Sequence, residues 1–190
     1  MKKMSAMAMV LGLLFTSGCG KISPTGPSEA VAAENSTASK NVTTATATPF
    51  LSFSPNQTTV RVGEEVTVEA RVDNATDIWG VATTVQFDSN KLQFVKAEEG
   101  ALIGVQNPTG FMSAVSGGNQ NHLVVGLASL GRELPGVTGY GSLFRITFRA
   151  LSAGSSEISF IETALFNSTN EGISKQKMNF TSRSATIVIE

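Results

Sequence analysis

The sequence is poor in cysteine and histidine, with Cys19 and His122 as the single members of each type. A lone thiol cannot form an internal disulfide, and free thiols are unusual in exported proteins. A zinc site built from His and Cys needs three or four such ligands. These absences exclude a disulfide scaffold and a His/Cys zinc centre.

Charged residues are also scarce, at 15% of the chain, where a typical domain has about 25%. The sequence has 14 basic and 15 acidic residues. Without residues 1–18 it loses only Lys2 and Lys3, so the remaining net charge is −3. Nucleic-acid binding requires a basic face. We therefore predict that the chain does not bind nucleic acid.

The first nineteen residues have the pattern of an export signal. Two lysines precede an apolar stretch over residues 4–15. That stretch is shorter than the ~20 residues of a membrane-spanning helix but normal for a signal peptide. Thr16-Ser17-Gly18 then precede Cys19, which resembles the lipobox of bacterial lipoproteins, whose cysteine is acylated. We predict a signal peptide over 1–18 and lipidation at Cys19; the alternative is a plain secretory signal.

Residues 19–48 are predicted to be a flexible tether behind this anchor. After Cys19 the segment has no aromatic residue and is rich in Ser, Thr and Ala. Such a segment cannot bury enough apolar surface to offset its ordering entropy. As a coil it would span about 30 Å. Gly20 follows the anchor where Asp would signal inner-membrane retention, so we expect display at the outer membrane or cell surface.

Residues 49–190 form one predicted all-β domain. Apolar and polar residues alternate over residues 65–73 and 79–87, which is the period of a half-buried strand. Further short strands are predicted over 92–96, 123–128, 144–149, 158–160 and 187–189, with turn residues between them. No convincing helical run is present. About nine strands in this length indicate a jelly-roll β-sandwich.

Three stretches of this domain together resemble a cohesin domain. They are residues 80–88 with 91–95, residues 123–129, and residues 141–150 followed by Gly154, Ile158 and Phe160. The resemblance implies the jelly roll of that family, which is related to some carbohydrate-binding modules. It also implies a protein partner, since cohesins bind calcium-loaded dockerin modules in polysaccharide-degrading complexes. The calcium belongs to the dockerin, so no cofactor is implied for this chain.

The sequence departs from the cellulosomal cohesins at the positions that bind the partner. Those cohesins carry Asn and Asp at the places that Gly80 and Ala82 occupy here. They carry a Leu and an acidic residue near Gly126 and Ser129. The polar anchors of a cellulosomal dockerin site are therefore missing, and the resemblance does not define the partner.

Residues suited to catalysis or metal binding do not form a recognisable site in the sequence. His122 is expected at an exposed strand start, without a nucleophile in a Gly-x-Ser-x-Gly turn. The acidic pairs at 64–65 and 98–99 are expected in solvated turns, although a carboxylate pair assembled by the fold stays open. Asp73, Asn74 and Asp77 share one loop that could hold Ca²⁺, but an Asx-rich turn is favoured. We predict no enzymatic activity.

Trp79 and Tyr140, each the single residue of its type, are candidates for a carbohydrate platform. A platform requires exposed, coplanar rings. Strict alternation puts Trp79 on the apolar face of its strand, so core packing is expected.

Alternation also predicts a partner-binding face. If Val81, Val85 and Phe87 are buried, the residues between them face outward. The predicted outward set is Gly80, Ala82, Thr84, Gln86, Val124, Gly126 and Ala128. This patch has little charge and few long side chains, which favours a protein-interaction module; the alternative is a carbohydrate-binding module. A covering segment, such as residues 172–181, would instead make the patch interior.

Overall fold

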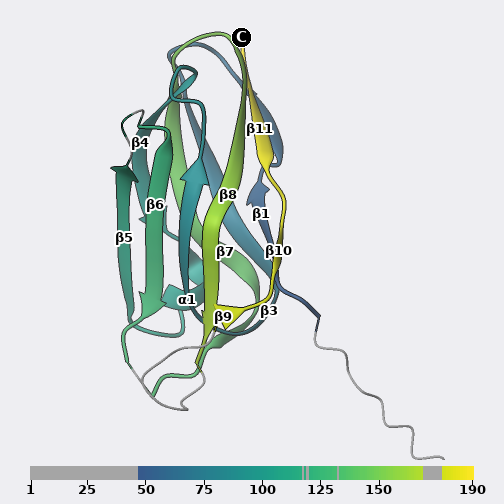
Figure 1. Cartoon of the computed structure of the whole chain (residues 1–190), viewed down its shortest axis with the longest axis vertical. Coiled ribbons are helices and arrows are strands. Elements are labelled where there is room, and N and C mark those ends of the chain that lie inside the picture. The colour runs from purple at the N-terminus through teal and green to yellow at the C-terminus, as the bar shows by residue number, and fades with distance from the viewer. Residues whose placement is uncertain (1–46, 117, 119, 132, 169–176) are drawn as a thin grey trace, which may run out of the picture. The chain divides into compact units, whose positions relative to one another are not determined.

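The longest element of the structure is β3 (Glu65–Gln86), a strand of 22 residues that takes part in both layers of the fold. The computed structural model describes residues 47–116, 118, 120–131, 133–168 and 177–190. Alternate residues of β3 are buried, because successive side chains of a strand point to opposite faces. Figure 1 shows β3 passing behind the front strands of the domain.

One layer is built around the first half of β3. Its members besides β3 are β1 (Phe50–Ser54), β7 (Val137–Ala150), β4 (Leu92–Glu99) and β10 (Thr181–Ser182). β1 and β7 lie on the two sides of β3, and both are antiparallel to it. Ala70 of β3, for example, pairs with Phe53 of β1 on one side and with Phe144 of β7 on the other. β4 pairs with the outer side of β7 and ends the layer.

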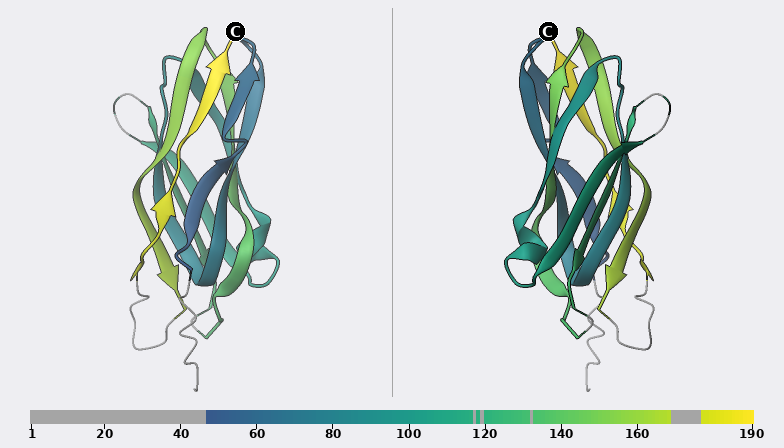
Figure 2. Two further views of the ribbon diagram at one scale, coloured as in Figure 1. Left: turned by 90° about the vertical axis from the view of Figure 1, so that its right-hand side faces the viewer. Right: turned by 90° about the vertical axis from the view of Figure 1, so that its left-hand side faces the viewer.

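The other layer is built around the second half of β3. Here β6 (His122–Ser129) and β8 (Gly154–Asn167) flank β3. β5 (Thr109–Ser116) pairs with β6, and β9 (Lys177–Met178) pairs with β8. β8 continues past β3 to pair with β11 (Ala185–Ile189), which pairs in parallel with β2 (Gln57–Val60). Figure 2 shows these strands from the two sides.

β3 crosses between the layers over residues 72–78, where its pairing with β7 is irregular. Asn74 and Asp77 adopt φ values of 55° and 57° there, a region that Asn and Asp tolerate. The Asp77 carboxylate accepts hydrogen bonds from the Gly136 amide at 2.9 Å and the Ser168 amide at 3.2 Å. The Ser168 hydroxyl donates to the same carboxylate. Asp77 thereby joins the crossing of β3 to the start of β7 and the end of β8.

The space between the layers is filled by aliphatic and aromatic side chains. Among the fully buried ones are Leu51, Ile78, Leu123, Phe144, Phe148 and Leu165. Phe53 and Phe160 stack with ring centroids 4.1 Å apart, and Phe87 packs on Phe148 at 4.9 Å. Burial of side chains of this size contributes about 1.5–3 kcal/mol each before the entropy cost of folding is subtracted.

The predicted all-β jelly-roll sandwich is confirmed. The described residues form eleven strands, and the excess over about nine comes largely from the two-residue β9 and β10. Two predicted strands are one continuous β3, while β1, β2 and β5 were not predicted. The described residues also include a short helix, α1 (Ala101–Gly104), where none was expected.

Several predictions concern residues outside the described part of the chain. The predicted signal peptide, Cys19 and the predicted tether up to residue 46 all lie there. Within the residues that the structure does describe, no helix has the length and apolar character required to span a membrane.

Candidate functional site

The second layer presents an outer face made by β8, β3, β6 and β5 in that order. Residues directly opposite each other on neighbouring strands lie on the same face. One row across the face therefore contains Ala164, Ala82, Gly126 and Met112, and the next contains Ile161, Thr84, Val124 and Ala114. We call this surface, with the rows at Gly80 and Gln86, the docking face.

The docking face carries almost no charge. The residues paired in its rows include no Asp, Glu, Lys or Arg; besides the two rows above they are Phe166, Gly80, Ala128, Gly110, Ser159, Gln86, His122 and Ser116. The nearest acidic residue along β8 is Glu162, which has φ 46° and lies at a bulge between Ile161 and Ala164. A surface without charged groups loses little solvation energy when it is covered.

One end of the docking face is hollowed. The hollow has a volume of about 430 Å³, and its lining is predominantly apolar. Its larger lining side chains come from Trp79, Met112, Leu130 and Phe166, and its smaller ones from Gly80, Ala82, Gly110, Gly126 and Ala128. Met112 and Leu130 are 66% and 62% exposed, and with the rest of the lining they form a contiguous apolar patch, a feature typical of interaction sites.

Glycine lets the large side chains lie close to the sheet. A Cβ atom at Gly126 would stand 3.1 Å from Cγ of Met112, and one at Gly110 would stand 3.2 Å from Cδ2 of Leu130. Both distances are shorter than ordinary van der Waals contact. The two glycines therefore form the floor over which Met112 and Leu130 extend.

Five of the seven residues predicted to face a partner are accessible. Ala82, Gln86 and Val124 are exposed, while Gly126 and Ala128 are half-buried. The other two, Gly80 and Thr84, are buried, so their predicted exposure is wrong.

Neighbouring strands account for both buried positions. At Gly80, a Cβ would stand 3.1 Å from that of Ala128, so the backbones are closely apposed. Thr84 is 8% exposed because the β-branched residues Val124 and Ile161 flank it on both sides.

The prediction that Trp79 packs in the core is wrong. A register shift between Ile78 and Gly80 adds one residue to β3 and breaks the strict alternation. Ile78 and Val81 both remain buried, and Trp79 lines the hollow as a half-buried side chain. Its indole nitrogen donates a hydrogen bond to the Gly131 carbonyl at 3.3 Å.

The residues that sequence reasoning missed come mainly from β5. Met112 lies in β5, where apolar residues occupy both odd and even positions over residues 110–115. Leu130 follows β6 directly, and Phe166 lies near the end of β8. Without a clear period of two, the sequence gives only a weak signal for β5.

The segment proposed as a possible cover of the face is only partly described. Residues 172–176 lie outside the described part of the chain. In residues 177–181, Lys177 and Met178 pair with β8, and Thr181 pairs with β1. The described part of this segment therefore adds short strands to the edges of β8 and β1.

Asp73, Asn74 and Asp77 lie within β3 where it crosses between the layers, so the prediction that they share a loop or an Asx-rich turn is wrong. Besides the bonds to the Asp77 carboxylate, the Asp77 amide donates to Thr138 Oγ1 at 3.1 Å. Within the described ranges, no group of three or more His, Cys, Asp or Glu side chains is arranged to hold a metal.

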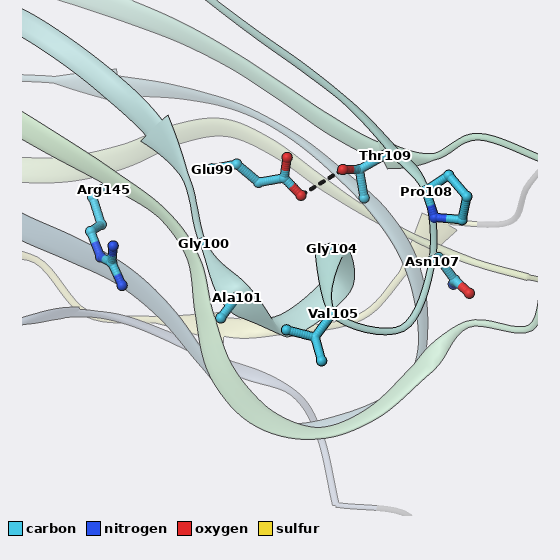
Figure 3. A pocket seen from close by; sticks show the side chains of 9 residues that line it. All are labelled: Glu99, Gly100, Ala101, Gly104, Val105, Asn107, Pro108, Thr109 and Arg145. Atoms are coloured by element: carbon cyan, nitrogen blue, oxygen red, sulfur yellow. Dashed lines mark hydrogen bonds between the residues drawn. The ribbon is translucent and has the colours of Figure 1, made fainter.

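A second hollow of about 370 Å³ lies beside α1 (Figure 3). Glu99 supplies the carboxylate in the lining of this hollow. The Glu99 carboxylate accepts a hydrogen bond from the Thr109 hydroxyl at 2.6 Å. Arg145 lies apart from Glu99, and its Nε binds Glu69 Oε1 at 2.8 Å. The one carboxylate in this lining has no second carboxylate beside it, so the lining does not form the pair that glycoside hydrolysis uses.

Other predicted polar residues lie in strands or at their ends. His122 is the first residue of β6, as expected, but it is half-buried and not exposed. Glu98 and Glu99 end β4 and Glu65 begins β3, so their predicted place in turns is wrong. Glu65 binds Arg149 of the facing strand at 3.0 Å.

The outer face of the first layer is charged, in contrast to the docking face. Glu69 binds Arg145 at 2.8 Å and Arg71 at 3.3 Å. The hydrogen bond from Arg145 is the main reason why the pKa of Glu69 lies below its ordinary value, and Arg71 lowers it further, while partial burial opposes the shift. We call this surface on β4, β7 and the first half of β3 the charged face.

The fold is similar to that of solved cohesins. A non-cellulosomal cohesin from Archaeoglobus fulgidus is 19% identical, with a TM-score of 0.60, over 76% of this chain and 92% of that one. A type II cohesin from the cellulosome of Acetivibrio cellulolyticus is 20% identical, with a TM-score of 0.62, over 74% and 95%.

Complexes with a bound partner are also among the similar structures. The sixth cohesin of scaffoldin B from Acetivibrio cellulolyticus, solved with a mutant Cel5 dockerin, is 16% identical with a TM-score of 0.62, over 76% of this chain and 100% of that one. No curated protein matches the chain. The family model of the cohesin domain matches residues 51–187, which is most of the chain. The chain therefore belongs to the cohesin domain family.

Proposed function

We propose that this protein is a non-catalytic docking module that binds a dockerin-type partner through its docking face. The observation that carries the proposal is the uncharged, hollowed surface of β8, β3, β6 and β5 in a member of the cohesin family. Other cohesins of this fold are solved in complex with dockerins. A role in assembling polysaccharide-degrading proteins is part of the proposal.

The composition of the docking face suits the core of a protein interface. Interface cores are depleted in charged residues and enriched in aromatic residues and Met. Small side chains such as Ala82 and Gly126 lose little conformational entropy on binding. Trp79 and Met112 supply larger apolar area at the hollow. Binding would therefore derive from apolar contact in the hollow and close approach over the rest of the face.

The partner is expected to be less polar than a cellulosomal dockerin. Ala82 stands where cellulosomal cohesins place a polar anchor, and Gly126 also lacks a side chain that could bind a polar group. A partner with buried charges on its side of the interface would leave them unpaired, which costs several kcal/mol. We therefore expect the partner to insert one or two aliphatic or aromatic side chains into the hollow.

Affinity capture tests the docking proposal. The bait is residues 47–190, which span the whole domain because solved cohesins are covered over 92–100% of their own length. An Ala82→Arg bait provides the matched control. We expect the parent bait to recover a dockerin-bearing protein from the native organism in Ca²⁺, and to lose it in chelator. Equal recovery of that protein by both baits would contradict the use of the docking face.

Lipidation of Cys19 is the second part of the proposal. It rests on the apolar stretch over residues 4–15 and the small residues before the single cysteine. Two or more acyl chains would give a stable membrane anchor. Cys19→Ser is expected to move the protein from the membrane fraction to the aqueous fraction, or to leave the precursor uncleaved. Unchanged partitioning into the detergent phase would show that Cys19 is not the anchor.

Carbohydrate binding is a second candidate, favoured by the position of Trp79. The indole lies at the outer hollow, where aromatic rings can stack on sugars, and Tyr140 is 74% exposed elsewhere. Affinity electrophoresis against a panel of polysaccharides tests this candidate. Retardation that is lost in Trp79→Ala but kept in Tyr140→Ala would support it, and unretarded migration on every polymer would exclude it for that panel.

A further inference from the structure

β5 is an edge strand, and the direction of its free backbone groups follows from two backbone hydrogen bonds of β6 and its flanking residues. The Phe87 amide donates to the Asn121 carbonyl in line with the β3–β6 register, so odd-numbered residues of β6 bind β3. The even-numbered residues of β6 therefore bind β5, which agrees with the bond from the Leu130 amide to the Pro108 carbonyl. On β5, the amides and carbonyls of Phe111, Ser113 and Val115 then point away from β6.

This edge lacks the features with which sheets avoid pairing with other chains. Over its eight residues, β5 has no charged residue and no proline, and its register with β6 has no shift. β4, the edge strand of the other layer, has Lys96, Glu98 and Glu99 and a register shift after Phe94. β2 also ends a sheet but has only four residues. Of the described edge strands, β5 alone is long, regular and uncharged.

We propose that β5 pairs with β5 of a second copy of this chain in antiparallel orientation. A row of unpaired amides and carbonyls is satisfied by another strand, and a strand of equal length and no charge is available on an identical chain. Self-pairing of a charged strand would place like charges close together, which β5 avoids. The contact is the same on both copies, so it closes on itself as a dimer.

The pairing would join the two docking faces. Each copy contributes the order β8, β3, β6, β5, so the joined sheet would continue through β5 into the second copy. Both docking faces would then lie on the same side of one sheet, and Met112 of each copy would lie near the junction. This inference does not depend on the identity of the partner, because it concerns backbone groups at the edge and not the residues of the face.

Sedimentation equilibrium tests the proposal on residues 19–190 with Cys19→Ser, which removes the signal and the thiol. Ser113→Pro deletes an amide that points to the free edge and leaves the β5–β6 bonds in place. Ala114→Lys, at an exposed position of the same strand, places a charge beside the edge as a second variant, and Ser113→Ala is the matched control. We expect the parent chain and Ser113→Ala to form a dimer, and both other variants to dimerise at least about tenfold more weakly, with unchanged thermal unfolding midpoints.

Three outcomes would overturn the proposal. They are a parent chain that stays monomeric up to millimolar concentration, a dimer that both Ser113→Pro and Ala114→Lys leave intact, and open-ended assembly without a defined dimer. If Ser113→Pro lowers the unfolding midpoint, the Ala114→Lys result decides. Loss of dimerisation in Ser113→Pro with retained capture of a dockerin-bearing protein would separate this edge from the docking face.

Discussion

The two outer faces of this domain differ in chemistry although both include residues of β3. On the charged face, Glu65 and Glu69 of the first half of β3 bind arginines of β7. On the docking face, the second half of β3 presents Ala82, Thr84 and Gln86 between strands that also lack charge in the paired rows. A strand that passes through both layers thus carries two different surface patterns.

The difference indicates which face is built to stay in water. Ion pairs between exposed strands are satisfied by each other and by solvent, and they contribute about 0–1 kcal/mol each. Covering them with a partner would require desolvation of several charges. The docking face has no such cost and exposes Met112 and Leu130. The comparison therefore supports the proposal that a partner binds the second layer while the first layer stays in contact with water.

The largest expected effect comes from placing a charge on the docking face. Ala82→Arg should weaken capture of the dockerin-bearing partner by about 100-fold or more, because the guanidinium would be buried without a partner. The unfolding midpoint should change little, since Ala82 is exposed. Isothermal titration measures the affinity. Ala101→Arg, the same change at an exposed position beside the other hollow, should bind like the parent; equal weakening by both would contradict the assignment.

The crossing of β3 between the faces depends on Asp77. Asp77→Ala leaves the Gly136 and Ser168 amides without their acceptor, which should lower the free energy of unfolding by about 1–3 kcal/mol. Urea denaturation of residues 47–190 measures this. An unchanged free energy of unfolding would show that the hydrogen bonds of Asp77 do not stabilise the crossing of β3.

Truncation inside the hollow should separate binding from stability. Met112→Ala removes a side chain that is 66% exposed in the free domain and would be buried by a partner. We expect about tenfold weaker binding with an unchanged unfolding midpoint. Val105→Ala is the control, because Val105 is 79% exposed at the other hollow. Normal binding by Met112→Ala would mean that the partner does not enter the hollow.

The smallest effect concerns acid stability and the charged face. The pKa of Glu69 is lowered in the folded protein, so its contribution is complete above its ordinary value of 4.5. As the pH falls below that value and through the folded pKa, protonation breaks the contacts with Arg145 and Arg71. Thermal unfolding between pH 7 and pH 3 should show a loss of about 1 kcal/mol or less that Glu69→Gln lacks. A parallel decline in both proteins would assign the effect to other carboxylates.

The sequence predicted the parts of the fold that depend on period-two alternation. Residues 65–73 and Val81, Thr83, Val85 and Phe87 have the predicted orientation, since strands with one buried face must alternate. The order and spacing of the predicted strands were also enough to identify the resemblance to cohesins, which the family model confirms. Alternation carries no information on which strands are neighbours, so the pairing of β3 with four others could not be derived from it.

The candidate site was predicted less completely for three physical reasons. A bulge after Ile78 shifts Trp79 outward, and one extra residue in a strand leaves little trace in the sequence. Burial of Thr84 depends on Val124 and Ile161, which are distant in sequence. Met112 belongs to a strand with a weak apolar pattern. The direction of a side chain was therefore predictable, while its exposure depends on partners that only the fold brings together.

The pairing of β1 bears on how the domain would resist a pull from a membrane anchor. β1 is the first strand of the domain and is bonded to β3 along its full length, with β10 on its other side. In the proposed arrangement, tension from Cys19 would reach the domain at Phe50, while a partner on the docking face would hold the second half of β3. Phe50 pairs with Asp73, so both loads would enter this antiparallel pair at the same end. The hydrogen bonds between β1 and β3 would then open one by one from Phe50, and the pairing of Phe50 and Leu51 with β10 would be the additional contact that resists this opening.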